Sequence, residues 1–341
     1  CLVDTFDRNF QFNVEHVALA KRADIFLVAP ASANVIGKIA GGIADDMLTT
    51  TIMACKAPKL ISPAMNTNMF ENPIVQDNLK KLRSYGYEVI QPASGYLACG
   101  DTGAGKMPEP ETLLAYILRT IACEKDMVGK KVLVTAGPTQ EPVDPVRFIT
   151  NHSTGKMGYA IAENCMRRGA EVTLVSGPVQ IAPPLCVRVI PVVTAADMAA
   201  AVKECYQEQD IIIKTAAVAD YRPDEQASEK IKRETKGEMS LRLVPNKDIA
   251  ASLGAIKREN QILVGFALET NNEMAHAEGK MKRKNLDFIV LNSLKDAGAG
   301  FRCDTNKITI IDNAGGVTSY PLKTKREVAS DIVNKLVTLL K

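Results

Sequence analysis

The sequence lacks the features that mark membrane-spanning, disulfide-bonded and metal-cluster proteins. No apolar run approaches the roughly 18 residues that cross a bilayer, and no signal peptide is visible. The eight cysteines form no CxxC pair, and the three histidines are scattered through the chain. In a chain of this length such cysteines indicate reduced thiols. We therefore expect a cytoplasmic protein with no disulfide framework and no zinc site, and the residues alone name no metal ligand.

A strong charge of either sign is also missing. The chain has 42 Lys and Arg residues against 39 Asp and Glu residues, which gives a formal net charge of +3. Apart from one basic cluster at residues 280–284, the basic residues are dispersed, so a nucleic-acid-binding face is not indicated. We expect small-molecule substrates, which can be anionic, and neither a nucleic-acid nor a membrane partner.

The length and the patterning predict two α/β domains. A chain of 341 residues with 46% apolar content is long enough for about two domains, each with its own core. Short apolar runs alternate with helical periodicity, which indicates two doubly wound, Rossmann-like, three-layer domains with parallel sheets. The polar segment 124–130 favours a boundary between domains at 1–124 and 125–341. The chain begins at Cys1 in mid-pattern, so we expect the N-terminal part of the first domain to be missing.

The individual elements follow from the same patterns. In the first domain we expect strands at residues 24–30, 59–63 and 87–91 and helices at 33–55, 74–84 and 111–123. In the second domain we expect strands at 131–137, 171–176, 187–193, 210–216, 261–268 and 287–292. Helices are predicted at 156–168, 195–207, 272–284 and 325–340, and a hairpin at 307–312 and 316–320.

One segment of the first domain fits neither a helix nor a strand pattern. Residues 98–110 contain Cys99, three glycines and two prolines, which predicts a tight loop. A cysteine in such a loop can act as a thiolate or proton donor, and mobile glycines can let the loop close as a lid. A surface loop with an incidental thiol fits the same residues.

Polar side chains follow two of the predicted strands in this domain. Asn66 ends a Pro-Ala-Met-Asn run after one strand and Ser32 follows another, so both can face one crevice at the carboxyl ends of the strands. An asparagine there can orient a carboxylate or merely cap a turn. His16 lies on a predicted helix, where it can exchange a proton near neutral pH or simply pack.

The second domain lacks the GxGxxG fingerprint of dinucleotide-binding proteins. Residues 150–158 (TNHSTGKMG) lead instead into a helix, where small polar residues and glycine can form an anion cradle or a plain cap. Residues 216–223 (AAVADYRP) end a strand and precede a charge run that is typical of a solvated face. As a flap, that run can bring Lys230 to a phosphate. Lys280 and Lys284 are four residues apart, so they share one helix face.

These segments resemble one known family over essentially the whole chain. Residues 13–20, 63–73 and 98–110, in this order, resemble the flavin-dependent cysteine decarboxylases, and the second half is similar to phosphopantothenate–cysteine ligase. The sequence is thus identified as a member of the bifunctional phosphopantothenoylcysteine decarboxylase/phosphopantothenate–cysteine ligase family of coenzyme A biosynthesis. The resemblance implies an incomplete flavodoxin-like flavoprotein domain followed by a ligase domain. It also implies a homo-oligomer, because the family's FMN lies between subunits.

For the first domain the resemblance implies FMN-dependent decarboxylation of phosphopantothenoylcysteine to 4′-phosphopantetheine. FMN oxidises the cysteine thiol to a thioaldehyde and so supplies the electron sink that a simple carboxylate lacks. His16 would assist deprotonation, Asn66 would hold the carboxylate and Cys99 would protonate the enethiol. Ser32 would contact FMN. Lys106 stands where an arginine is common, which removes a bidentate contact.

For the second domain the resemblance implies CTP-dependent condensation of 4′-phosphopantothenate with cysteine through an acyl-cytidylate, with Mg²⁺ on the triphosphate. Asn151 matches the residue that stabilises this intermediate, and Lys230 is the other expected catalytic residue. The implied nucleotide-binding positions are Ala216, Asp220, Lys230, Lys247, Asp248, Ile249, Ala250, Phe266, Lys280 and Lys284. Lys247 stands where the family usually has proline, and these residues leave ATP open as the nucleotide.

Two other functions remain open. The first half can be a non-catalytic module that oligomerises an active ligase, and a flavin spectrum of the purified protein would distinguish this from a working decarboxylase. An NAD(P)-dependent dehydrogenase also fits the alternation of strands and helices. The absence of GxGxxG and of a Tyr-x-x-x-Lys set disfavours it.

Overall fold

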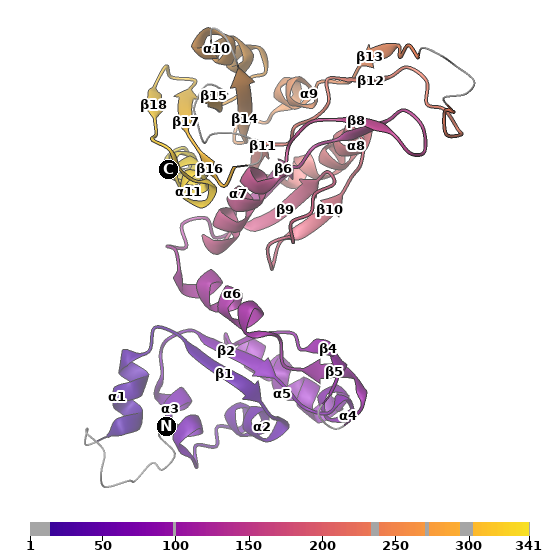
Figure 1. Cartoon of the computed structure of the whole chain (residues 1–341). Coiled ribbons are helices and arrows are strands. Elements are labelled where there is room, and N and C mark those ends of the chain that lie inside the picture. The colour runs from indigo at the N-terminus through magenta and orange to yellow at the C-terminus, as the bar shows by residue number, and fades with distance from the viewer. Residues whose placement is uncertain (1–13, 98–99, 233–238, 270–272, 294–302, 341) are drawn as a thin grey trace. The chain divides into compact units, whose positions relative to one another are not determined.

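The computed structural model describes residues 14–97, 100–232, 239–269, 273–293 and 303–340, and Figure 1 shows the whole chain. The chain divides into two compact units, residues 1–124 and 125–341. Each unit is an α/β fold with a parallel sheet, which confirms the predicted fold class. Within the described ranges, no helix is long and apolar enough to cross a membrane.

The first unit is built on a parallel sheet with the order β1 (Phe26–Ala31), β2 (Lys59–Pro63), β3 (Glu88–Val89). Its described helices are α1 (Glu15–Arg22), α2 (Ala33–Gly41), α3 (Met47–Ala54), α4 (Thr67–Glu71), α5 (Pro73–Ser84) and α6 (Pro110–Ile121). Val28 and Ile61 of the strands pack with α2 and α5 in one core, and Leu60 packs with Leu113 of α6 in another. Because both faces of the strands are buried, the strands are continuous apolar runs.

The helical structure predicted at residues 33–55 is confirmed, but it is divided into two helices. Gly42 ends α2 in the left-handed conformation, with a φ of 76°. Asp46 then caps α3, since its carboxylate accepts a hydrogen bond from the amide of Thr49 while the Thr49 side chain binds the Asp46 backbone. The apolar periodicity continues through the turn, and this hid the break.

The loop predicted at residues 98–110 is partly wrong. Strands β4 (Ala93–Tyr96) and β5 (Thr102–Lys106) pair antiparallel, while Cys99 lies outside the described residues. Gly105 has a φ of 123°, and a Cβ there would lie only 2.2 Å from the carbonyl oxygen of Met65. A Cβ on Gly103 would lie 2.4 Å from Thr67 Oγ1. These glycines therefore allow β5 to lie against the segment that carries Asn66.

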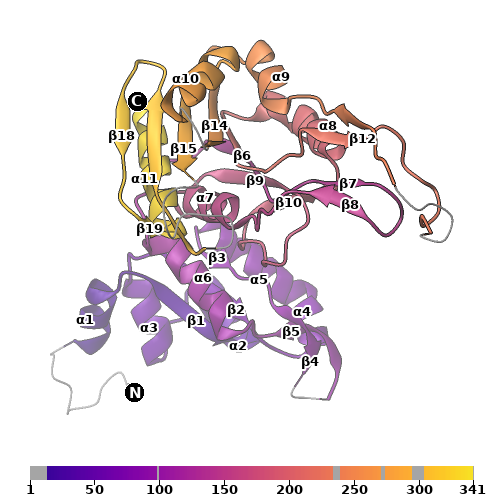
Figure 2. The same ribbon diagram turned by 45° about the horizontal axis from the view of Figure 1, so that its top comes forward.

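The second unit has an eight-stranded sheet, whose edges β10 and β18 are seen in Figure 2. In spatial order the strands are β10 (Arg188–Pro191), β9 (Glu171–Ser176), β6 (Lys131–Ala136), β11 (Ile211–Lys214), β14 (Ile262–Glu269), β15 (Phe288–Ser293), β17 (Ile308–Asp312) and β18 (Val317–Ser319). The first six are parallel and the last two antiparallel. The six strands and the hairpin predicted for this unit are thus confirmed, with small shifts at their ends.

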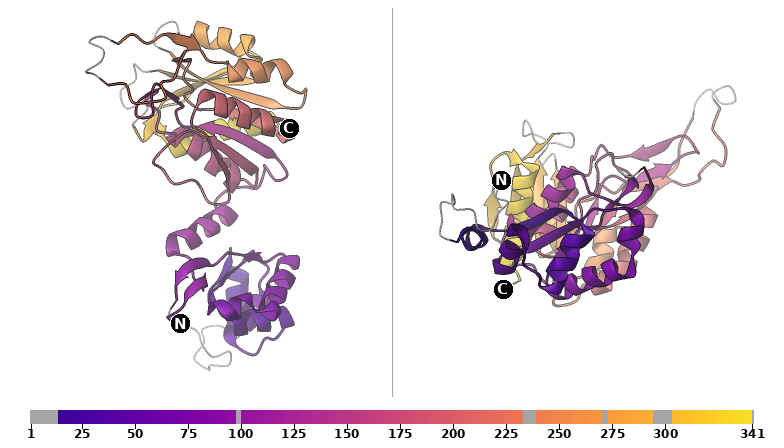
Figure 3. Two further views of the ribbon diagram at one scale, coloured as in Figure 1. Left: turned by 90° about the vertical axis from the view of Figure 1, so that its right-hand side faces the viewer. Right: turned by 90° about the horizontal axis from the view of Figure 1, so that it is seen from below.

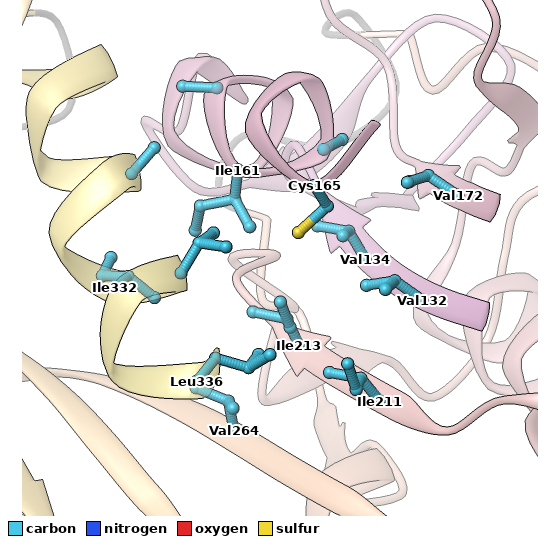
Figure 4. Close-up of a cluster of buried hydrophobic side chains, with 14 of the residues drawn as sticks. Val132, Val134, Ile161, Cys165, Val172, Ile211, Ile213, Val264, Ile332 and Leu336 are labelled. Carbon is cyan, nitrogen blue, oxygen red and sulfur yellow. The ribbon is translucent and has the colours of Figure 1, made fainter. Parts of the chain in front are cut away.

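Helices cover both faces of this sheet. They are α7 (Lys156–Arg167), α8 (Ala195–Cys205), α9 (Ile249–Ile256), α10 (Glu273–Arg283) and α11 (Lys325–Thr338), with a 3₁₀ turn (Tyr206–Glu208) after α8. Figure 4 shows one core, in which Ile161 of α7 and Leu336 of α11 lie over Val134 and Ile213. On the other face, Ile212 packs with residues of α8, α9 and α10. Each fully buried side chain of this size contributes about 1.5–3 kcal/mol.

The strand order contains a switch point. From β6 the chain winds outward through β9 to β10, then returns to β11 and winds the other way through β14 to β15. The connections after β6 and β11 therefore diverge at the carboxyl ends of two neighbouring strands. In open parallel sheets this is where ligands bind.

Two antiparallel pairs that we did not predict project from the second unit (Figure 3). They are β7 (Gln140–Pro142) with β8 (Phe148–Thr150), and β12 (Tyr221–Pro223) with β13 (Leu243–Pro245). A further short pair joins β16 (Thr305–Asn306) to β19 (Lys323–Thr324). Residues 224–242 connect β12 to β13 and carry Lys230, and we call this segment with its two strands the arm.

Candidate active sites

A cavity of about 510 Å³ lies at the carboxyl ends of the strands in the second unit. It is lined by residues that follow β6 and β11, by residues within β14, and by the starts of α7 and α9 and the end of α10. Its position is the switch point between β6 and β11, and its size is that of a small-molecule site. The fold therefore positions this cavity for a ligand.

The start of α7 lies unusually close to the two central strands. Gly158 has no side chain, and a Cβ there would lie 2.4 Å from Thr215 Oγ1 and 2.6 Å from the Cβ of Ala136. Gly137 directly follows β6 and Gly155 caps the start of α7, with φ values of 75° and 77°. Turn, close approach and helix packing are what the glycines of GxGxxG supply. Here the β7–β8 hairpin separates the first of them from the others.

The cavity is strongly cationic. Among the described residues that line it, the charged side chains are Lys156, Lys214, Lys247, Lys280, Lys284, Lys325, Asp220 and Asp248. Six lysines against two aspartates make a field that favours a polyanion, and low-dielectric walls strengthen that field. The chain as a whole is close to neutral, so this concentration of charge is local.

Asp248 and Lys284 form the ion pair at one side of the cavity. Lys284 Nζ lies 2.7 Å from Asp248 Oδ2, and the other carboxylate oxygen accepts the amide of Ala251 as the cap of α9. Burial opposes ionisation of Asp248, but the Lys284 ammonium and the helix amides outweigh it and hold its pKa below the ordinary value. The carboxylate of Asp248 is therefore ionised at neutral pH.

Two asparagines shape the segment that follows β11. Asn151 Nδ2 donates to the carbonyl of Ala217 at 3.0 Å, and Asn246 Nδ2 donates to the carbonyl of Ala219 at 2.9 Å. The amide of Asn246 also donates to the carbonyl of Asp220 at 2.7 Å. These hydrogen bonds hold the backbone of residues 216–220 where it lines the cavity.

The structure brings together nearly all the site residues predicted for this unit. The predicted residues that line the cavity are Asn151, Ala216, Asp220, Lys247, Asp248, Ile249, Ala250, Phe266, Lys280 and Lys284. Lys230 does not line it and lies in the arm. Their roles stay predictions, but their convergence follows from the fold, since segments up to 130 residues apart end at one sheet edge.

A buried carboxylate fixes the arm next to Lys230. Asp144, only 2% exposed, accepts the amide of Ile231 at 3.2 Å and pairs with Arg147. Arg147 also donates to the carbonyl of Ile231. Burial opposes ionisation of Asp144, but the amides of Val146, Ile231 and Arg147 and the Arg147 guanidinium lower its pKa to about 2. The backbone next to Lys230 is therefore held in place at Ile231.

Sequence reasoning missed several cavity residues, of which Lys214 and Asn292 stand out. Both line the cavity, and each has a buried polar atom, Lys214 Nζ and Asn292 Oδ1, with no hydrogen-bond partner among the described residues. Lys214 ends an apolar strand, and the only signal in the sequence was a lysine at the end of Ile-Ile-Ile. Such a residue is usually exposed, so the pattern gave no reason to select it.

In the first unit, Ser32 and Asn66 follow neighbouring strands at one edge of the sheet. The amide of Ala64 donates to the carbonyl of Ala31 at 3.0 Å, which sets the two segments side by side. Ser32 caps α2, and Asn66 caps α4 by accepting the amide of Asn68. Asn66 Nδ2 donates to a carboxylate oxygen of Asp101 at 2.8 Å. Its amide is therefore already in a geometry that binds a carboxylate.

His16 lies on α1, away from these residues. Figures 1 and 2 show α1 and α4 at opposite sides of the β1–β2 sheet. The Nδ1 atom of His16 is buried without a hydrogen-bond partner in the described part of the chain. The structure thus brings Ser32 and Asn66 together but not His16, and Cys99 lies outside the described residues.

The described residues contain no cluster of three or more His, Cys, Asp or Glu side chains that could hold a metal ion. A cationic cavity at a switch point, joined in one chain to a second α/β unit with polar groups at its strand ends, indicates a two-domain enzyme for small-molecule substrates.

Comparison with known proteins gives the family. The family described as Flavoprotein matches residues 1–122, and the DNA/pantothenate metabolism flavoprotein C-terminal domain matches residues 127–340. The Coenzyme A biosynthesis bifunctional protein CoaBC of Bacillus subtilis (strain 168) is 47% identical over 341 residues, 99% of this chain and 84% of its own length. The chain belongs to this family of bifunctional coenzyme A biosynthesis enzymes, which combine a decarboxylase with a ligase.

Two further similarities bear on each unit. A Cysteine/Cysteine sulfinic acid decarboxylase of an unknown prokaryotic organism is 49% identical over 344 residues, 99% of this chain and 96% of its own length. The crystal structure of the C-terminal domain of a CoaBC protein is 44% identical, with a TM-score of 0.55, over 64% of this chain and 98% of that one. The second match is close in sequence as well as in fold.

Proposed function

We propose that the second unit condenses 4′-phosphopantothenate with cysteine at the expense of CTP, and that the first unit decarboxylates the product to 4′-phosphopantetheine with FMN. The observation that carries the proposal is the cationic cavity at the switch point. Six lysines line it, together with all the residues predicted for nucleotide binding except Lys230. A triphosphate and a phosphorylated carboxylate are the kind of ligands such a cavity selects.

The ligase reaction would proceed in two steps. The carboxylate of 4′-phosphopantothenate attacks CTP, which forms an acyl-cytidylate and releases pyrophosphate. The amine of cysteine then displaces CMP and forms the amide. Lys280 and Lys284 neutralise charge on the departing pyrophosphate, with Mg²⁺ carried by the triphosphate, while Asn151 positions the acyl-cytidylate. Lys230, which lies in the arm beside the held Ile231, would supply a further positive charge to the phosphates.

In the first unit, the polar groups at the strand ends fit a flavin and a carboxylate. These residues would hold FMN, which would supply a reversible two-electron oxidation of the substrate thiol, the electron sink for loss of carbon dioxide, with the electrons returned to the decarboxylated product. Ser32 is exposed, and its hydroxyl accepts the Val35 amide, which leaves its O–H to donate to the flavin. Asn66 would exchange the carboxylate of Asp101 for that of the substrate. His16 would assist deprotonation through a ring nitrogen that has no partner among the described residues.

We also propose that the protein works in the cytoplasm as a homo-oligomer, in which His16 of one copy and Asn66 of another share a site. The separation of α1 from α4 supports this, because one chain alone does not bring the two residues together. Light scattering during size-exclusion chromatography tests it, and a monomer that retains decarboxylase activity would contradict it.

Mass spectrometry of products is the decisive test. The purified chain is given phosphopantothenate, cysteine, CTP, Mg²⁺ and FMN, and 4′-phosphopantetheine is expected. Accumulation of phosphopantothenoylcysteine alone would support an active ligase joined to a non-catalytic module. Because one relative is named as a cysteine decarboxylase, a second assay gives the protein cysteine alone and measures its decarboxylation. Decarboxylation of free cysteine without any condensation would overturn the ligase assignment.

A further inference from the structure

Lys214 is a buried amine that the predicted reaction leaves unused. It is the last residue of β11, after three buried isoleucines, and is only 8% exposed. Its Nζ atom has no hydrogen-bond partner among the described residues, yet the residue lines the cationic cavity. A buried amine without a hydrogen-bond partner destabilises the folded state, so its presence in a cavity indicates a function.

The charged neighbours of Lys214 cancel each other. The side chain faces the same side of the sheet as Ile212, toward α9 and α10. Asp248, which caps α9, and Lys284, which follows α10, act electrostatically on its amine. These two are already paired at 2.7 Å, so neither compensates the amine. The sheet neighbours in register are Thr135 and Gly265, which are uncharged.

The remaining charged groups of the cavity lie on other segments. They are Lys280 on α10, Asp220 and Lys247 on the connections after β11 and β13, Lys156 on α7 and Lys325 on α11. Burial lowers the pKa of Lys214 to about 7, an effect that Asp248 opposes and Lys284 reinforces. In the empty cavity Lys214 is thus balanced between its two protonation states near neutral pH.

We propose that Lys214 is a proton-coupled binding residue, which is uncharged in the empty cavity above neutral pH and takes up a proton when a polyanionic substrate enters. The inference rests on the proposed function for the class of ligand, a nucleoside triphosphate. Negative charge beside a low-dielectric wall favours the ammonium form, so the cavity gains a positive charge only when there is an anion to attract it. The proton comes from solvent and returns there when pyrophosphate leaves.

This coupling differs from that of an ordinary cationic wall. A permanently charged Lys214 would add to the repulsion among the five other lysines of the empty cavity and would pay the full cost of burial. A Lys214 that is neutral in the empty cavity avoids both the repulsion and the cost of burying a charge. It follows that CTP affinity falls as the pH rises above about 7, by up to roughly tenfold per pH unit, until the amine no longer takes up a proton in the complex.

Isothermal titration calorimetry of the full chain with CTP tests this directly. Titrations with excess Mg²⁺ at about pH 8, in two buffers of different ionisation enthalpy, give the number of protons taken up per bound nucleotide. We expect a large fraction of one proton for the wild type. Lys214→Met is expected to bind CTP more weakly with no uptake. The control Lys203→Met removes an exposed lysine of α8 that does not line the cavity and is expected to keep the uptake.

Lys214→Arg covers the case in which Lys214→Met fails to fold. Its guanidinium stays charged, so it is expected to bind without uptake. CTP binding to the wild type without proton uptake would overturn this inference and leave the proposed function intact. Full proton uptake by either Lys214 variant would also overturn this inference and leave the proposed function intact. No binding of CTP to the wild type would instead overturn the proposed function, so the two failures are distinguishable.

Discussion

The two units place their chemistry differently. In the second unit a single fold gathers the predicted residues around one cavity, because segments distant in the chain end at one switch point. In the first unit Ser32 and Asn66 share one sheet edge, while His16 lies on a helix at the other side of the sheet. The difference shows that the fold of the second unit alone gathers the predicted residues at one sheet edge, whereas the fold of the first unit gathers Ser32 and Asn66 but not His16.

The largest effect is expected for a substitution in the cavity of the second unit, which should separate the activities of the two units. Lys284→Met removes a cavity cation and leaves the carboxylate of Asp248 unpaired. We expect ligase turnover to fall by roughly 10²-fold or more, since charge on the departing pyrophosphate loses a partner. Decarboxylation of supplied phosphopantothenoylcysteine should not change. Steady-state assays of each half reaction measure this, and an equal loss in both would mean that the two sites are not independent.

Asn66→Ala makes the reciprocal change in the first unit. It removes the donor to a carboxylate and the cap of the short helix α4. We expect decarboxylation to fall by roughly 10²-fold while condensation is preserved. The matched control is Asn72→Ala, which removes a similar cap from α5 at a position that faces no strand end. If this control loses as much decarboxylation, the effect of Asn66 is structural only.

Asp144→Ala tests whether the function of Lys230 depends on the contact between Asp144 and the backbone of Ile231. Without the carboxylate, the amide of Ile231 and the Arg147 guanidinium lose their partner, so we expect about a tenfold loss of condensation and faster proteolysis within the arm. Because the folded pKa of Asp144, about 2, lies below the ordinary value, its contribution to stability is present above about pH 4 and is lost as the pH falls toward 2. Asp144→Ala should therefore flatten the acid limb of the stability curve.

Gly105→Ala gives the smallest effect and sharpens the comparison within the first unit. The added Cβ would lie 2.2 Å from the Met65 carbonyl oxygen, at a φ of 123°. Gly86→Ala has a comparable φ of 84° but meets no atom within 4 Å, so it isolates the backbone strain. We expect Gly105→Ala to cost roughly 1–3 kcal/mol more than Gly86→Ala in the unfolding of this unit. Equal costs, measured by chemical denaturation, would show that β5 does not depend on this approach.

Much of this organisation could be predicted from the sequence. The apolar runs of β6, β9 and β11 and the helices between them have the periodicities that define parallel α/β folds. The cavity residues of the second unit follow, since polar segments after parallel strands converge. The sequence did not predict the break between α2 and α3 or the pairing of β4 with β5, because each depends on a glycine conformation or a tertiary contact. Lys214 was missed for a further reason, since its burial depends on two helices that follow later in the chain.

The separation of Gly137 from Gly155 by the β7–β8 hairpin has a consequence for how such sites are found. A search along the chain sees one isolated glycine, a hairpin and then a second short motif, none of which is diagnostic. In space Gly137 and Gly155 lie side by side between the end of β6 and the start of α7, since a Cβ on Gly155 would lie 3.4 Å from the Gly137 nitrogen, and the hairpin is inserted between them in the sequence. A fingerprint written as a distance along the backbone therefore misses a site whose geometry it describes.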